Sequence, residues 1–82
     1  HVGSGMMELP LEKGAIADGK RVRDVRWPSG CLIIGLRRGE SEIVPRGDTR
    51  LRAGDYLVVL FSGEEEREVL PAMRRLCDAR LD

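Results

Sequence analysis

The apolar stretch CLIIGL at residues 31–36 decides the fold of this 82-residue chain. Its length suits a strand, and the lack of polar interruptions predicts a strand buried on both faces at the centre of a sheet. A second apolar run, YLVVLF at residues 56–61, predicts another strand of the same sheet. A membrane-spanning helix needs roughly 20 apolar residues, so neither run predicts a membrane segment.

Two further strands are predicted beside these runs. Residues 8–12 contain Pro10, which cannot donate a hydrogen bond to an interior ladder, so they predict a weak edge strand. Residues 37–40 are polar and contain a glycine, which predicts a hairpin into a strand at residues 41–44. Gly35, inside the first run, would let a helix or another backbone approach closely, with plain helix-on-sheet packing as the simpler explanation.

Two turns are predicted between the hairpin and the last strand. Pro45 ends the preceding strand, and residues 46–50 are rich in turn-forming residues. In the second turn, at residues 53–55, Gly54 is expected to adopt a positive φ. Asp55 is expected to accept a hydrogen bond from a nearby backbone N–H.

Two helical regions complete the predicted domain. Asp18 is a suitable N-cap, and apolar residues spaced three apart predict a helix of about two turns over residues 19–26. A capping box formed by Ser62 and Glu65 begins a second region, which Pro71 is expected to split into two helical pieces. The sequence therefore predicts a small α+β domain: a four-stranded, mainly antiparallel sheet with one or two packed helices.

The charge composition disfavours nucleic acid as a partner. Fourteen Lys and Arg residues balance fourteen Asp and Glu residues, so no net positive charge drives binding to nucleic acid or to anionic lipid. The charge is nevertheless uneven, because residues 20–52 carry nine Lys or Arg against four Asp or Glu, an excess of five. This segment could surround a small anion.

Few residues are available for catalysis or metal binding. The single histidine, His1, lies in residues 1–6, which have the composition of a tag and linker ahead of a domain at residues 7–82. A Ser/His/Asp or Cys/His site is therefore excluded, and the sequence has no glycine-rich phosphate loop. Cys31 and Cys77 lie apart in apolar patterns, which predicts reduced core thiols in a cytosolic protein and no metal site. We expect neither an enzyme nor a cofactor.

Arginine and tryptophan are the side chains most suited to binding a ligand. Guanidinium groups bind phosphate through parallel hydrogen bonds, although a salt-bridged, solvated surface is the simpler interpretation for any one arginine. Trp27 follows Arg26 and precedes Pro28. Its ring either packs against the sheet or stacks on a ligand or partner subunit.

Three stretches resemble the TrkA-C family, also called RCK C-terminal domains: DGKRVRDVR at residues 18–26, GCLIIGLRRG at residues 30–39, and IVP at residues 43–45 followed by GDTRLRAGDYLVV at residues 47–59. The resemblance covers nearly all of residues 7–77. It implies an α+β domain that usually dimerises and that belongs to a membrane transporter or channel, in the same or a partner chain. Such a domain would be a cytosolic sensor.

Some members of this family resemble receptors for cyclic di-AMP, which they bind at a two-fold dimer interface. The resemblance, together with the position of Trp27, predicts ligand contacts at seven residues: Asp24, Val25, Arg26, Trp27, Leu32, Ile33 and Pro45. Arg26 matches the arginine at the end of the family's helix. Leu32 differs from the polar amide that the clearest nucleotide binders carry at this position.

Two interpretations of the function follow. The first is a homodimeric regulatory domain of a membrane cation transporter or channel, with potassium as the favoured ion and cyclic di-AMP as the candidate regulatory ligand. The second is a ligand-independent dimerisation module of an ion transporter or exchanger, which Leu32 favours. Both predict a cytoplasmic domain that reaches the membrane through the full-length transporter.

Overall fold

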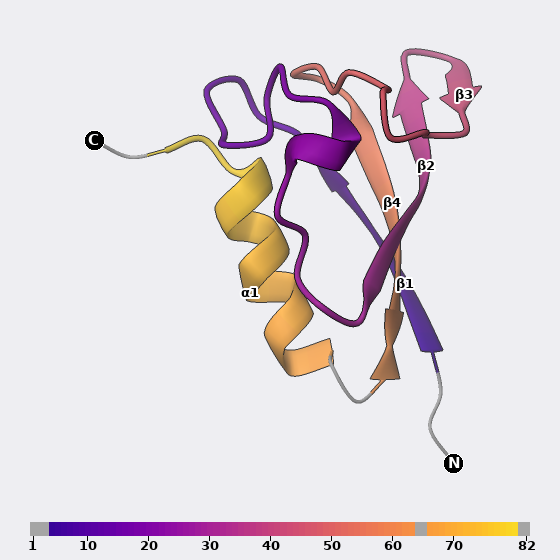
Figure 1. The fold of residues 1–82 in the computed structure, drawn as a ribbon, viewed down its shortest axis with the longest axis vertical. Helices are drawn as coiled ribbons and strands as arrows, with labels where there is room; N and C mark the ends of the chain where they lie inside the picture. Colours follow the sequence, from indigo (N-terminus) through magenta and orange to yellow (C-terminus); the bar gives the residue numbers. More distant parts are fainter. Residues whose placement is uncertain (1–3, 64–65, 81–82) are drawn as a thin grey trace.

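The computed structural model describes residues 4–63 and 66–80. Its elements are β1 (Ser4–Pro10), the 3-10 helix η1 (Val22–Asp24), β2 (Cys31–Arg38), β3 (Ser41–Ile43), β4 (Tyr56–Ser62) and α1 (Glu66–Cys77) (Figure 1). The strands form one four-stranded sheet in the order β1-β4-β2-β3, in which every pair is antiparallel. The predicted α+β architecture is therefore confirmed. None of the helices described is long and apolar enough to cross a membrane.

The hydrophobic core lies between α1 and one face of the sheet, the inner face. Leu57 and Val59 of β4 are fully buried there, as are Val69 and Met73 of α1. The opposite, outer face turns away from α1 and carries the alternate residues of β4 and β2, among them Leu32, which is 62% exposed. The expectation that residues 31–36 are buried on both faces is therefore wrong, because the described part of the chain places a covering layer on one face alone.

Gly35 marks a bulge in β2. Ile33 pairs with Val59 and Gly35 pairs with the adjacent Val58, so Ile34 is an extra residue in the ladder. A Cβ placed on Gly35 would meet the Val58 side chain at 3.5 Å, an ordinary contact. Neither a close backbone approach nor helix packing on Gly35 is found, and the expectation of one or the other is wrong.

The helix predicted over residues 19–26 is wrong, since only Val22–Asp24 form a single 3-10 turn. The backbone N–H and C=O groups that a helix would use here instead form hydrogen bonds with residues 47–51, which are distant in the sequence. The Val22 N–H donates to the Thr49 carbonyl at 2.9 Å, and the Arg23 N–H donates to the Gly47 carbonyl at 2.9 Å.

Asp18 is not the N-cap of a helix. Its carboxylate instead accepts hydrogen bonds from the N–H of Gly14, at 3.0 Å, and of Ala53, at 3.1 Å. Asp18 therefore links two loops, and the predicted cap is wrong because a tertiary partner occupies the carboxylate.

The last helix is one element, α1, with Pro71 inside it. The predicted split at Pro71 is wrong. Proline removes a single intrahelical donor, while Val69 and Met73 on either side of it are fully buried against the sheet and hold the two turns in line. Ser62 is the last residue of β4, and Glu65 of the predicted capping box lies outside the described residues.

The outer strands differ from their predicted bounds. β1 is an edge strand, as predicted, but it starts at Ser4 rather than at residue 8. Ser4 pairs with Ser62 and Met6 with Leu60, so residues 4–6 are part of the sheet. The predicted hairpin is confirmed between β2 and β3, with Gly39 at φ +60.

Candidate functional site

Arg26 stands on a loop that buried neighbours hold in place on both sides. Val25 is 7% exposed and belongs to the core. Trp27 is half-buried against the core, and its indole Nε1–H donates to the Val22 carbonyl at 2.9 Å. The Cys31 Sγ–H donates to the Pro28 carbonyl at 3.1 Å and fixes the far end of the loop. The Arg26 side chain itself is exposed.

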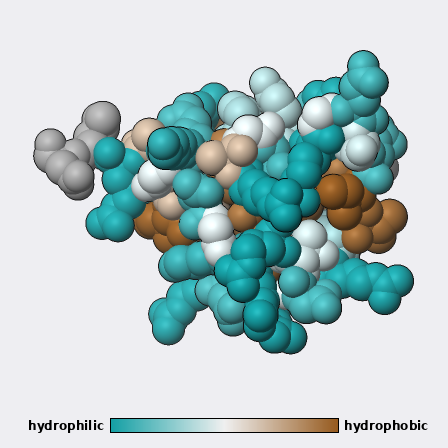
Figure 2. All heavy atoms as spheres, turned by 90° about the horizontal axis from the view of Figure 1, so that it is seen from above, coloured by the Kyte–Doolittle hydropathy of each residue, from teal (hydrophilic) through white to brown (hydrophobic). Residues whose placement is uncertain are grey.

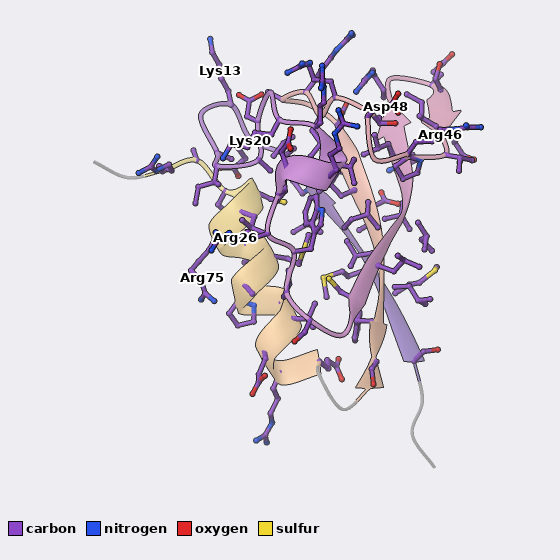
Figure 3. The ribbon with its side chains drawn as sticks, in the orientation of Figure 1. Lys13, Lys20, Arg26, Arg46, Asp48 and Arg75 are labelled. Carbon is purple, nitrogen blue, oxygen red and sulfur yellow. The ribbon has the colours of Figure 1, made fainter. Side chains whose placement is uncertain are left out.

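A groove runs between this loop and α1, and we call it the Pro28 groove. One end is a hollow of about 240 Å³, lined by Ile16, Arg26, Pro28, Ala72, Arg75 and Leu76. The adjoining hollow of about 500 Å³ shares three of these residues and is lined by Pro28, Ser29, Glu68, Val69, Pro71, Ala72 and Arg75. Figure 3 shows Arg26 beside α1, the helix that carries Arg75.

The Pro28 groove combines an apolar floor with the positive charges of Arg26 and Arg75 at one end, and the Glu68 carboxylate lines the adjoining hollow. Within residues 4–63 and 66–80, neither Arg26 nor Arg75 forms an ion pair, whereas the neighbouring Arg74 pairs with Asp78 at 3.7 Å. A guanidinium group binds a phosphate or carboxylate group bidentately, and its plane also stacks on rings. The arrangement therefore suits an anion that carries a planar or apolar group.

The other predicted ligand residues are spread over the molecule. Leu32 lines a separate hollow of about 280 Å³ with Ser4, Gly30, Cys31, Leu60, Phe61 and Ser62. Ile33 packs against the core from the inner face. Asp24 is exposed at the end of η1, and Pro45 is half-buried in the connection from β3 to β4. Of the seven predicted residues, Arg26 lines the Pro28 groove and the other six do not.

Arg75 is the groove residue that sequence reasoning missed. It lies three residues after Ala72 and one before Leu76, so the helical spacing that predicted α1 also places the three on neighbouring positions of one helix. The docking of α1 beside Pro28 depends on tertiary packing, which the spacing does not give.

Two other arginines have structural partners. The Arg38 Nε–H and Nη2–H donate to the two carboxylate oxygens of Asp55, each at 2.8 Å. The Arg37 guanidinium pairs with Glu8 and lies 5.3 Å from the centre of the Tyr56 ring. For Arg37 and Arg38, the salt-bridged interpretation of the arginines is confirmed.

Asp55 is the buried charge of the domain, at 1% exposed. Its carboxylate also accepts the Arg52 N–H at 2.9 Å, as predicted for this turn, and Gly54 adopts φ +94. Burial raises the pKa of Asp55, but the hydrogen bonds from Arg38 and Arg52 together with their positive charges outweigh burial. The pKa of Asp55 is therefore held below its ordinary value, so the carboxylate is charged at neutral pH. Its hydrogen bonds connect β2 to the turn before β4.

Both cysteines are free thiols. Burial, with a smaller effect of the Asp78 charge, raises the pKa of Cys77 to about 12, and burial also raises the pKa of the half-buried Cys31. A raised pKa keeps a thiol protonated and unreactive at neutral pH. The described residues hold no group of three or more side chains able to bind a metal ion.

These features define the class of domain: one helix on one face of a four-stranded antiparallel sheet, with an arginine-bordered groove beside the helix. The family model of the TrkA-C domain matches residues 6–74. A solved structure described as an RCK domain with cda matches the fold with a TM-score of 0.67 and 26% identity, covering 87% of this chain and 96% of that one.

Curated relatives are proteins of ion transport. The Trk system potassium uptake protein TrkA homolog of Archaeoglobus fulgidus is 38% identical over 60 residues, which cover 73% of this chain and 14% of that protein. The Trk system potassium uptake protein TrkA of Mycobacterium tuberculosis is 31% identical over 74 residues, which cover 85% of this chain and 34% of that protein. The putative Na⁺/H⁺ antiporter YjbQ of Bacillus subtilis is 34% identical over 59 residues, 72% of this chain and 9% of the antiporter.

The chain belongs to the TrkA-C domain family, as its sequence motifs predicted. It spans 14% of the Archaeoglobus relative and 34% of the Mycobacterium relative, so it corresponds to one part of much longer proteins.

Proposed function

We propose that this domain senses a small anionic ligand and regulates a membrane cation transport system, with potassium as the favoured ion. The Pro28 groove carries the proposal, because it places the guanidinium groups of Arg26 and Arg75 at the border of an apolar floor. The similarity to potassium uptake proteins and to a putative Na⁺/H⁺ antiporter supports a transport system as the setting. In this proposal the domain is cytoplasmic, is not an enzyme and acts as a homodimer on a transporter or channel subunit.

The proposed ligand is cyclic di-AMP. Each of its two phosphodiesters carries one negative charge and lies close to a planar base. In the groove, a guanidinium group can bind the phosphate, and apolar side chains can pack against the base. A two-fold dimer would present two copies of Arg26 to the two phosphates. The solved relative described as an RCK domain with cda supports a small-molecule ligand for this fold.

A ligand in the Pro28 groove would contact two separate parts of the fold, the loop at Pro28 and the helix α1. A ligand shifts an equilibrium between two arrangements only if it binds one of them more tightly. The proposed signal is therefore a preferred spacing of the loop and α1, which the dimer passes to the membrane protein.

A thermal-shift titration with cyclic di-AMP tests the ligand, with ATP and cyclic di-GMP titrated separately as control nucleotides. At a hundred times the dissociation constant, a ligand stabilises the folded state by about 2.7 kcal/mol. We expect a saturable rise in melting temperature for cyclic di-AMP alone, lost in Arg26→Ala and weakened in Arg75→Ala. Arg74→Ala is the matched control, because Arg74 is on the same helix but pairs with Asp78.

Two results would count against this proposal. An Arg26→Ala protein that responds like the wild type would show that the site lies elsewhere. A wild-type protein without any shift would exclude cyclic di-AMP and leave the second function, a ligand-independent dimerisation module of an ion transporter or exchanger. The position of Leu32 favours that second function, because its side chain is 62% exposed on the outer face, away from the groove. Under it, Arg26→Ala would leave self-association unchanged.

A further inference from the structure

Two segments that are distant in the sequence pair with each other at the upper end of the molecule in Figure 1. The first is residues 18–24, which contain η1, and the second is residues 46–52; we call the pair the arginine ribbon. Arg21 is opposite Arg50 in an antiparallel bridge, and the Leu51 N–H donates to the Lys20 carbonyl at 2.8 Å. These backbone bonds hold the two segments at a fixed spacing.

The arginine ribbon is cationic although the whole chain is neutral. The ribbon carries six Lys or Arg residues against three Asp residues, whereas the chain has fourteen of each charge. Its cations are Lys20, Arg21, Arg23, Arg46, Arg50 and Arg52; Arg21 is half-buried and the other five are exposed. Within residues 4–63 and 66–80, none of these six side chains forms an ion pair. The positive charge of the ribbon is therefore available to a partner.

The pairing of the two segments brings like charges together. Arg21 and Arg50 are directly opposite each other, an arrangement that destabilises paired strands when both residues carry the same charge. The Arg50 Nη1–H donates to the neutral carbonyl of Gly19 at 2.7 Å. A Cβ on Gly47 would lie 3.5 Å from the Arg23 Cβ, so Arg23 stands across the ribbon from the residue that follows Arg46. The fold retains a repulsion that an anionic partner would relieve.

The surface of this end indicates the kind of anion that fits it. Figure 2 looks down on the end from above and shows a largely hydrophilic surface with hydrophobic residues at its sides, and Figure 3 places Lys20, Arg46 and Asp48 there. Asp24 and Asp48 are exposed within the ribbon. A lipid surface or a duplex nucleic acid presents negative charge to the whole ribbon and would repel both carboxylates. A flexible acidic peptide can place its carboxylates on the guanidinium groups alone.

We propose that the arginine ribbon docks an acidic peptide segment of the transport protein. This role rests on the proposed function, in which the domain acts on a transporter or channel subunit, and it names the surface that meets that subunit. Guanidinium groups bind carboxylates through two parallel hydrogen bonds, and the ribbon presents them in two rows at a fixed spacing. No residue that lines the Pro28 groove belongs to the ribbon, so a ligand in the groove leaves it accessible.

Fluorescence anisotropy with a labelled peptide of alternating glutamate and glycine tests this surface on the 82-residue chain. At low salt, where charges are weakly screened, we expect saturable binding that weakens as salt is added. Arg23→Gln combined with Arg46→Gln should raise the peptide dissociation constant about tenfold, because two charge-assisted contacts are lost. Neither side chain forms a hydrogen bond within the described residues, and circular dichroism confirms that the variant is folded. Arg23→Lys combined with Arg46→Lys should retain most of the binding.

Arg67→Gln combined with Arg74→Gln is the matched control, because it removes the same charge from two exposed positions of α1. It should bind the peptide as the wild type does. An equal loss in the two glutamine pairs would overturn the inference, since net charge rather than the ribbon would then decide binding. A wild-type chain that does not bind the peptide at low salt would also overturn it. So would phosphatidylglycerol vesicles that bind through Arg23 and Arg46 when the peptide does not, because they would make a lipid surface the partner.

Thermal shifts with cyclic di-AMP separate this inference from the proposed ligand site. The ribbon variants keep every residue of the Pro28 groove, so their response to cyclic di-AMP should equal that of the wild type. Arg26→Ala should instead lose the cyclic di-AMP response and bind the acidic peptide normally. If the peptide result fails while the cyclic di-AMP result holds, the docking surface is wrong and the ligand site is not.

Discussion

Asp55 shows how one buried carboxylate organises the polar part of this fold. It is fully buried, yet four described groups hold or balance its charge: the Nε–H and Nη2–H groups of Arg38, the Arg52 N–H and the Arg52 guanidinium. Arg38 also donates to the Arg50 carbonyl at 2.9 Å. The network therefore joins β2, the turn at residues 53–55 and the segment at residues 47–51, which forms hydrogen bonds with the chain around η1. Loss of the Asp55 charge should therefore weaken the hydrogen bonds that connect these three parts of the fold.

Asp55→Asn should destabilise the fold by about 2 to 3 kcal/mol, because an amide cannot accept two charge-assisted hydrogen bonds from Arg38. Urea unfolding followed by Trp27 fluorescence gives the free energy of unfolding. Glu8→Gln is the control: its ion pair with Arg37 is solvent-exposed, so its loss should change stability by less than about 1 kcal/mol. Equal losses in the two variants would contradict the structural role of Asp55.

The same residue predicts a pH dependence. The folded-state pKa of Asp55 is lowered, so its contribution to stability is fully present above the unfolded-state pKa of about 3.9 and is lost as the pH falls through the folded-state value. The stability difference between wild type and Asp55→Asn should therefore be constant near neutral pH and shrink below about pH 4. A difference that stays constant down to pH 2 would show that the effect of the substitution is not electrostatic.

At the scale of elements, alanine substitutions at two glycines distinguish the stability cost of an unfavourable φ from the cost of steric contact by the added Cβ. Gly54 adopts φ +94, so Gly54→Ala should cost about 1 to 2 kcal/mol of stability although nothing lies within 4 Å of the new Cβ. Gly35 has an ordinary φ, and a Cβ there would meet Val58 at 3.5 Å. Gly35→Ala should therefore change stability by less than about 1 kcal/mol. Urea unfolding at one protein concentration measures the free energy of unfolding of both variants. A larger loss of stability for Gly35→Ala than for Gly54→Ala would contradict this explanation.

Sequence reasoning correctly predicted the elements whose structure depends mainly on their own residues and immediate neighbours in the chain. The apolar runs of β2 and β4, the hairpin at Gly39 and the turn at Gly54 follow from side-chain pattern and turn chemistry, and all are present. The helix over residues 19–26 failed because the decisive hydrogen bonds reach residues 47–51, which a local pattern does not contain. The two-sided burial of β2 failed for the same kind of reason: an apolar run does not say how many layers cover it.

The candidate site divides in the same way. A motif on the chain pointed to Arg26, and the structure places it at the border of a groove. Arg75 and Ile16 join it there from α1 and from the loop after β1, and only the packing of α1 beside Pro28 brings them together. Leu32, near Arg26 in the sequence, lines a different hollow because alternate residues of a strand point to opposite faces.

For the whole molecule, the Pro28 groove and the outer face lie on opposite sides of one sheet. The Pro28 groove is beside α1, and the outer face is turned away from it. A change at the groove would reach the outer face through the sheet, whose inner face packs on α1 through Leu57 and Val59 and whose outer face carries Val58 and Leu60.

The beginning of β1 provides the last prediction. Residues 1–6 were expected to be a tag and linker, yet Ser4, Gly5 and Met6 pair with β4 opposite Ser62, Phe61 and Leu60. The Phe61 ring covers Gly5 so closely that a Cβ there would lie 2.6 Å from Cζ. A chain that starts at Met7 should therefore lose about 1 to 2 kcal/mol of stability, from three lost cross-strand pairs and a partly uncovered Phe61 ring.

Urea unfolding at equal protein concentration measures this loss. Deletion of residues 1–3 alone is the matched control, because it keeps every described pair of β1. The control should be as stable as the full chain. If the chain that starts at Met7 is also as stable as the full chain, the pairs at residues 4–6 contribute nothing, and β1 effectively begins at Met7. If it is less stable, residues 4–6 belong energetically to the fold whatever their origin, because the edge strand needs them to cover Phe61.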